Sequence, residues 1–93
     1  MPHGKIRQVI EETRFRLELR RLIKTAERAD EFVDGAKWLL ARDPMQGKQI
    51  GNSMVWFLAM KQKVGILPVV IYYTFDEGNV NLLSIQETIY GPE

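Results

Sequence analysis

The chain has 93 residues, of which 45% are apolar and 27% are charged, with a net charge of +1 at neutral pH. This length suits a single domain over residues 1–93 with a thin core, and this composition is typical of a folded globular protein. There is no cysteine and one histidine, His3, which excludes disulfides, a thiol nucleophile and a zinc site built from several such ligands. We therefore expect no metal and no cofactor.

The apolar runs carry breakers such as Gly65 and Pro68, and no signal-peptide core follows the start. We accordingly expect a cytoplasmic protein that does not span a membrane. The charge is uneven: residues 1–48 hold eleven basic and eight acidic side chains, whereas residues 49–93 hold two and four. That asymmetry is a mild indication of an anionic partner.

The first half of the chain is predicted to form a strand and two helices. Residues 6–12 are rich in β-branched side chains, which favour a strand. Thr13 can cap a first helix, and Asp30 can cap a second that ends at Asp43-Pro44, where proline removes a backbone donor. The apolar positions at helical spacing are Phe15, Leu19, Leu22, Ile23 and Ala26 in the first helix and Phe32, Val33, Ala36, Leu39 and Leu40 in the second.

After a predicted loop at residues 44–53, the apolar period changes from 3.6 to 2. Strands are expected at residues 54–61, 69–75 and 80–88, the last two joined by the turn Asp76-Glu77-Gly78-Asn79, whose glycine and asparagine tolerate positive φ. The predicted fold is α+β with the order β-α-α-β-β-β. It is an antiparallel sheet of three or four strands with the N-terminal helical hairpin, residues 13–42, packed on one face.

Two surface features of the helices have a structural and a functional interpretation. Arg16, Arg20 and Lys24 are spaced i, i+4 and i+8, which favours a solvated basic face, with an acidic or nucleic-acid partner as the alternative. Trp38 is expected to pack at the hairpin edge beside Leu17, with an exposed anchor for a partner as the alternative.

The ordered set of elements and three local phrases resemble the RelE/ParE toxins of type II toxin–antitoxin systems. Arg42 to Gly47 resembles the family's helix-ending Pro-x-x-Gly loop, Val55 to Leu58 its second strand, and Val70 to Asp76 with Val80 to Ile85 its final hairpin. The resemblance spans residues 6–90. It implies a small bacterial toxin that is neutralised by a partner antitoxin. RelE-like members cut messenger RNA in the ribosome, and ParE-like members poison DNA gyrase.

The chain departs from the RNA-cleaving branch, whose open sheet face carries basic residues that stabilise phosphate charge. Phe57 and Ala59 stand where that branch is basic, and Val70 replaces its arginine. Tyr73 matches a family tyrosine but is expected on the core side. A catalytic interpretation therefore rests on Lys61, Lys63 and Tyr90, for which a solvated loop and a packing lid are the structural alternatives.

By alternation, Trp56, Leu58, Val69, Ile71, Tyr73 and Phe75 should face the core, which leaves Phe57, Ala59, Val70 and Tyr72, with Thr74, on the face without helices. Such an apolar face predicts binding of an amphipathic partner segment or a second copy of the chain, unless residues 44–53 or 89–93 cover it. The sequence thus favours a divergent toxin that acts by protein binding with weak or no ribonuclease activity. The alternatives are a ribosome-dependent mRNA endoribonuclease using Lys61, Lys63 and Tyr90, and a small interaction domain that is not a toxin.

Overall fold

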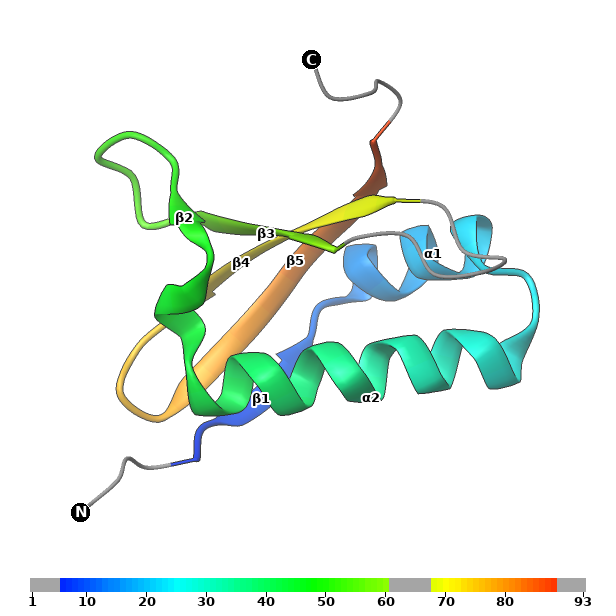
Figure 1. Ribbon diagram of the computed structural model, residues 1–93, viewed down its shortest axis with the longest axis horizontal. Coiled ribbons are helices and arrows are strands. Elements are labelled where there is room, and N and C mark those ends of the chain that lie inside the picture. Colours follow the sequence, from blue (N-terminus) through cyan, green and yellow to red (C-terminus); the bar gives the residue numbers. More distant parts are fainter. Residues whose placement is uncertain (1–5, 61–67, 89–93) are drawn as a thin grey trace.

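The computed structural model describes residues 6–60 and 68–88, in which two helices lie on one face of a five-stranded sheet (Figure 1). The elements in chain order are β1 (Gln8–Glu11), α1 (Thr13–Leu22), α2 (Ala26–Arg42), the 3-10 turn η1 (Pro44–Gln46), β2 (Lys48–Gln49), β3 (Trp56–Met60), β4 (Val69–Phe75) and β5 (Asn79–Glu87). Neither helix is long and apolar enough to cross a bilayer. The α+β class and the position of the helical hairpin are as predicted.

The sheet has the order β1-β5-β4-β3-β2 and is mixed. The pairs from β2 to β5 are antiparallel, whereas β1 runs parallel to β5, with Val9 opposite Val80. The predicted loop at residues 44–53 contributes the short strand β2, in which Lys48 lies opposite Phe57. The sheet therefore has one more strand than the sequence predicted, and β1 is not antiparallel.

The second helix begins at Ala26 instead of after Asp30. Ala29 lies within this helix and is buried in the core. Alanine has the highest intrinsic helix propensity, which agrees with the longer helix. Thr13 is the first residue of α1, and no side chain caps that helix.

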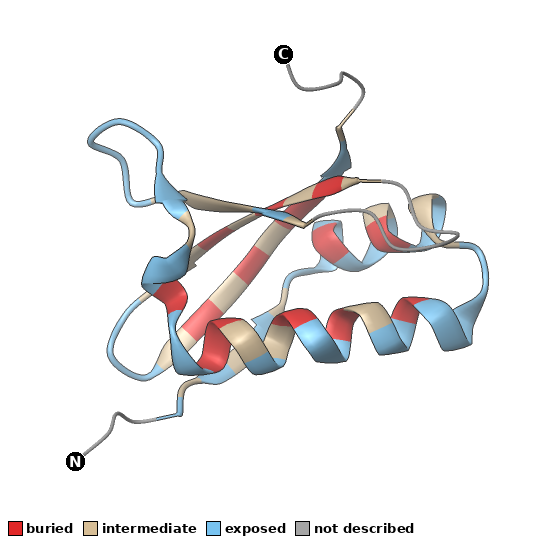
Figure 2. Ribbon diagram, in the orientation of Figure 1, coloured by how far each residue is buried: buried red, intermediate tan, exposed pale blue. Residues whose placement is uncertain are grey.

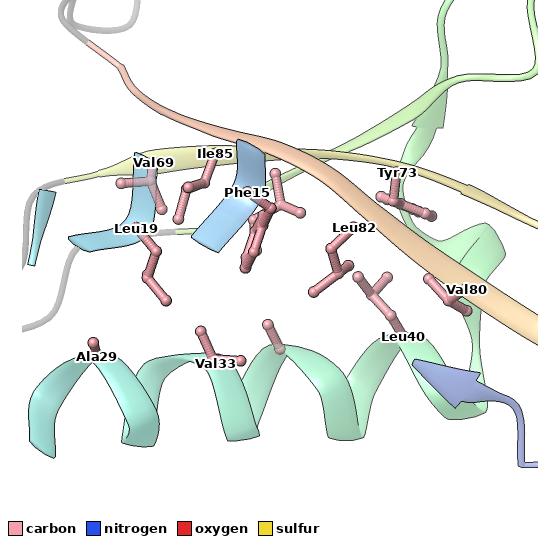
Figure 3. Packing of buried hydrophobic residues seen from close by; sticks show 12 residues of the cluster. Phe15, Leu19, Ala29, Val33, Leu40, Val69, Tyr73, Val80, Leu82 and Ile85 are labelled. Carbon is pink, nitrogen blue, oxygen red and sulfur yellow. The ribbon is translucent and has the colours of Figure 1, made fainter. Parts of the chain in front are cut away.

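The core lies between the sheet and the helices, where buried side chains from both layers meet (Figures 2 and 3). The predicted inward positions of β4 are buried, and Trp56, Leu58 and Phe75 pack against the cluster from the side. The alternation that was predicted for β3 and β4 is thus confirmed. The buried cluster consists of Phe15, Leu19, Ala29, Val33, Ala36, Leu40, Val69, Ile71, Tyr73, Val80, Leu82 and Ile85.

A β-bulge in β5 changes which side chains reach the core. Tyr73 lies opposite Leu82 and Tyr72 lies opposite Ser84, so Leu83 is an extra residue. Because a bulge shifts the alternation by one position, Leu82 and Ile85 are both fully buried although they are three residues apart.

The β4–β5 turn is held by a side chain and not by positive φ. The carboxylate of Asp76 accepts hydrogen bonds from the backbone N–H groups of Gly78 at 2.9 Å and Asn79 at 2.8 Å. These two bonds lower the pKa of Asp76. Among the described residues the glycine with positive φ is Gly51, so the predicted role of Gly78 was wrong.

Candidate functional site

The four residues predicted to bind a partner lie together on the sheet face opposite the helices. Strand register places Phe57 directly opposite Tyr72 and Ala59 directly opposite Val70. The rings of Phe57 and Tyr72 have their centroids 6.4 Å apart. Phe57, Val70 and Tyr72 are half-buried and Ala59 is exposed. We call these four residues the open-face cluster; their role in binding stays a prediction.

A shallow groove of about 510 Å3 adjoins the open-face cluster at Tyr72 and continues toward α1. Of this lining, only Tyr72 was predicted from the sequence as a site residue, because the other residues come from segments that only the tertiary structure brings together. The sequence signal for the bulge is the three-residue spacing of the buried Leu82 and Ile85. The lining residues are Glu12, Arg14, Val55, Tyr72, Leu83, Ser84 and Gln86.

The carboxylate of Glu18 forms hydrogen bonds with the edge of β5 beside this groove. Pairing with β1 ends where Glu11 meets Leu82, and farther along β5 the side chain of Glu18 replaces the missing strand. One Glu18 oxygen accepts hydrogen bonds from the hydroxyl of Ser84 at 2.6 Å and the backbone N–H of Ile85 at 3.1 Å. Burial opposes ionisation here, but these bonds and the bond from Arg14 together lower the pKa of Glu18.

The carboxylate of Glu18 also forms an ion pair with Arg14, which lines the groove. Arg14 donates from Nε to the other oxygen of Glu18 at 3.1 Å, while its side chain remains 71% exposed. Helical spacing puts both residues outside the apolar positions of the first helix and gives no sign of a tertiary contact. The structure instead joins them to Ser84 and brings one positive charge to the groove that Tyr72 lines.

The predicted catalytic residues Lys61, Lys63 and Tyr90 lie outside the described residues. Tyr73, the tyrosine expected on the core side, is fully buried there. Its hydroxyl donates to the carbonyl of Pro44, and burial raises the pKa of Tyr73 to about 12. It therefore keeps its proton at neutral pH and joins β4 to the turn after α2.

The loop of residues 44–53 does not lie over the open-face cluster. Its strand β2 pairs beside β3, so this segment widens the sheet at the Phe57 end. The other segment considered as a cover, residues 89–93, lies outside the described part of the chain.

On the outer surface of the helices, the expectation for Trp38 is wrong and the expectation of a solvated basic face is confirmed. Trp38 is 58% exposed and Leu17 is exposed as well, so the predicted packing of this tryptophan was wrong. The guanidinium of Arg42 instead lies 4.1 Å from the centre of the Trp38 ring. Arg16, Arg20 and Lys24 are exposed, as a solvated face requires, and the ion pairs found among the described residues do not include them.

Comparison with known proteins gives one structural likeness. No protein-family model matches the sequence, and no curated protein does. The fold matches a chain in the crystal structure of the toxin–antitoxin complex RelBE2 from Mycobacterium tuberculosis with a TM-score of 0.74. The match covers 97% of this chain and 100% of that one, at 17% sequence identity. This chain therefore has the same fold as that chain of the complex, which agrees with the fold that the sequence resemblance implies.

Proposed function

We propose that this chain is the toxin component of a toxin–antitoxin pair and acts in the cytoplasm by binding proteins, with weak or no ribonuclease activity. The observation that carries the proposal is the likeness to the RelBE2 complex over nearly the whole chain. The cognate antitoxin is the expected partner. Two cellular targets are expected as alternatives. One is the ribosome with its bound mRNA, and the other is DNA gyrase.

The composition of the open-face cluster supports binding over RNA cleavage. Phe57, Ala59 and Val70 offer no charge to a phosphate, and they occupy the positions where the resemblance to the RNA-cleaving branch leads us to expect basic groups. Loss of one charge-stabilising donor can cost on the order of a hundredfold in rate. Contiguous apolar surface on an uncovered sheet face is more typical of an interaction site.

One observation favours the second candidate, a ribosome-dependent mRNA endoribonuclease. Arg14 and Tyr72 line the same groove, so a cation and a phenol hydroxyl are both available there. In this candidate Lys61, Lys63 and Tyr90 would supply the remaining chemistry. The bond from Arg14 to Glu18 weakens the case, because the carboxylate partly neutralises the arginine.

The test expresses the chain in bacteria, alone and together with the polypeptide encoded by the reading frame adjacent to its gene. The proposal expects growth arrest by the chain alone, rescue by the second polypeptide and a purified complex of the two. Purified chain should leave ribosome-bound mRNA intact. Growth that is never arrested, together with no complex, would instead support a small interaction domain that is not a toxin.

Two biochemical assays separate the candidate targets. Inhibition of DNA supercoiling by purified gyrase would identify the ParE-like target. Cleavage of mRNA on ribosomes that is lost in both Lys61→Ala and Tyr90→Phe would establish the endoribonuclease and overturn the proposed binding mechanism.

A further inference from the structure

A second groove, separate from the open-face cluster's own groove, lies between α2 and β3. It has a volume of about 660 Å3 and is mainly apolar. Arg28 and Glu31 on α2 contribute one charge of each sign to its lining, so their net charge favours neither an acidic nor a basic occupant. The apolar lining residues are Phe32, Gly35, Trp38, Leu39, Leu58, Ala59 and Met60, of which Ala59 also belongs to the open-face cluster.

One wall of this groove is a strand edge without a partner strand among the described residues. The partner strand β2 covers β3 only at Trp56 and Phe57. The carbonyl of Val55 accepts from the N–H of Ile50 at 2.9 Å, so the backbone of Val55 faces the β2 side. Because backbone direction alternates along a strand, the N–H and C=O of Ala59 point to that same side, beyond the end of β2.

The opposite wall contains a glycine that nothing in the described chain requires. Gly35 lies inside α2, where glycine is less favourable than alanine by about 1 kcal/mol. Its φ is not positive, and a Cβ built there would meet no described atom within 4 Å. A glycine facing a groove does permit close approach by another backbone.

We propose that this groove receives an extended, uncharged segment of the partner protein, which adds to the sheet as a strand beside β3. The outward N–H and C=O of Ala59 supply the backbone hydrogen bonds, as in recognition by strand addition. Alternate apolar side chains of the segment enter between Phe32 and Met60, and its backbone passes over Gly35. The inference rests on the proposed function, which provides the partner.

The experiment uses the full chain and the polypeptide encoded by the adjacent reading frame. Gly35→Ala should raise the Tm of the free chain by about 4 °C, because it removes a helix-interior glycine, and should weaken the complex more than tenfold. Ala59→Pro should also weaken the complex more than tenfold, because proline removes the outward N–H while an edge position tolerates it. In hydrogen exchange, the amide of Ala59 should become protected only in the complex.

One matched control isolates these effects. Asp34→Ala is an exposed substitution on the same helix outside the groove lining. It should bind the polypeptide as the unchanged chain does.

The possible failures are distinguishable. If the unchanged chain forms no complex, the proposed function fails. If the complex forms but Gly35→Ala binds with unchanged affinity, or if the Ala59 amide stays unprotected in it, strand addition at this groove is wrong. A free chain that is already dimeric, with the Ala59 amide protected, would assign the edge to a second copy and overturn the proposal.

Discussion

The hydroxyl of Tyr73 donates a hydrogen bond to the carbonyl of Pro44, 29 residues earlier in the chain. Gly47 lies beside the same hydroxyl, and a Cβ built at Gly47 would come within 2.4 Å of it and of the carbonyl oxygen of Phe57. The Pro-x-x-Gly loop is thus tied to β4 at both of its characteristic residues. This contact fixes where the chain turns from α2 into β2 and so positions the edge of the open face.

Tyr73→Phe should lower the free energy of unfolding by about 1–3 kcal/mol, because it leaves the buried carbonyl of Pro44 without its donor. Urea unfolding of purified protein measures the change. Tyr72→Phe is the matched control, since its ring lies on the uncovered face, and it should have little effect. Equal stability of both variants would show that the Tyr73 bond contributes nothing.

The same tyrosine predicts a stability loss in alkali. Burial raises the pKa of Tyr73 to about 12 from an ordinary value of 10.0, so folding disfavours its ionised form. Its contribution is fully present below pH 10 and is lost as the pH rises toward 12. The stability of the unchanged chain should therefore fall faster than that of Tyr73→Phe over this window, as measured by urea unfolding at each pH.

Gly47→Ala should destabilise the chain by about 1–3 kcal/mol through overpacking, because the added methyl group meets backbone and a buried hydroxyl. Gly78→Ala is the control, since no described atom lies within 4 Å of a Cβ there. Thermal unfolding of the two variants provides the comparison. A Gly47→Ala variant as stable as the control would mean that the loop relaxes without cost.

The elements with strong apolar periodicity were predictable from the sequence. Helical spacing identified both helices, and two-residue alternation placed Ile71 and Tyr73 in the core, because burial on one face leaves a local pattern. The pairing of one strand with another leaves no such local pattern in the sequence. The short strand β2, the parallel direction of β1 and the bulge at Leu83 all depend on partners that are distant in sequence.

The candidate site was likewise predictable only where it depends on local alternation of side chains. Alternation placed the open-face cluster on one face, but the groove beside it includes Ser84, which Glu18 contacts across 66 residues of chain. An acidic residue on a basic helix face gives no signal of such a contact. Trp38 likewise has helical neighbours that permit packing, and only the tertiary arrangement leaves it exposed.

Glu18→Gln should destabilise the chain at neutral pH by about 1 kcal/mol, because it removes the charge that Ser84, Arg14 and Ile85 bind. The pKa of Glu18 is lowered by folding, so its contribution is present above its ordinary value of 4.5 and is lost as the pH falls through the folded-state pKa. The stability difference between Glu18→Gln and the unchanged chain should shrink over this acidic window.

Urea unfolding from pH 7 to pH 3 measures that difference. Glu77→Gln, an exposed change in the β4–β5 turn, is the control and should follow the unchanged chain at every pH. A stability difference for Glu18→Gln that stays constant through the acidic range would show that these hydrogen bonds do not stabilise the ionised form of Glu18.

The double variant Val70→Ser/Tyr72→Ser should remain folded but lose association with the polypeptide of the adjacent reading frame. Both side chains alternate with the buried positions of β4 and so project from the face without helices; their loss leaves the core intact and removes apolar area from the open-face cluster. Truncating an interface tyrosine typically costs about 2 kcal/mol or more, which corresponds to roughly thirtyfold in affinity. Calorimetric titration measures binding, and urea unfolding confirms the fold. Thr74→Ser/Asn81→Ser changes a neighbouring polar pair that joins β4 and β5 and should bind normally. Unchanged association of the first variant would assign the partner elsewhere, and its unfolding would show that the chain's own structure needs this surface.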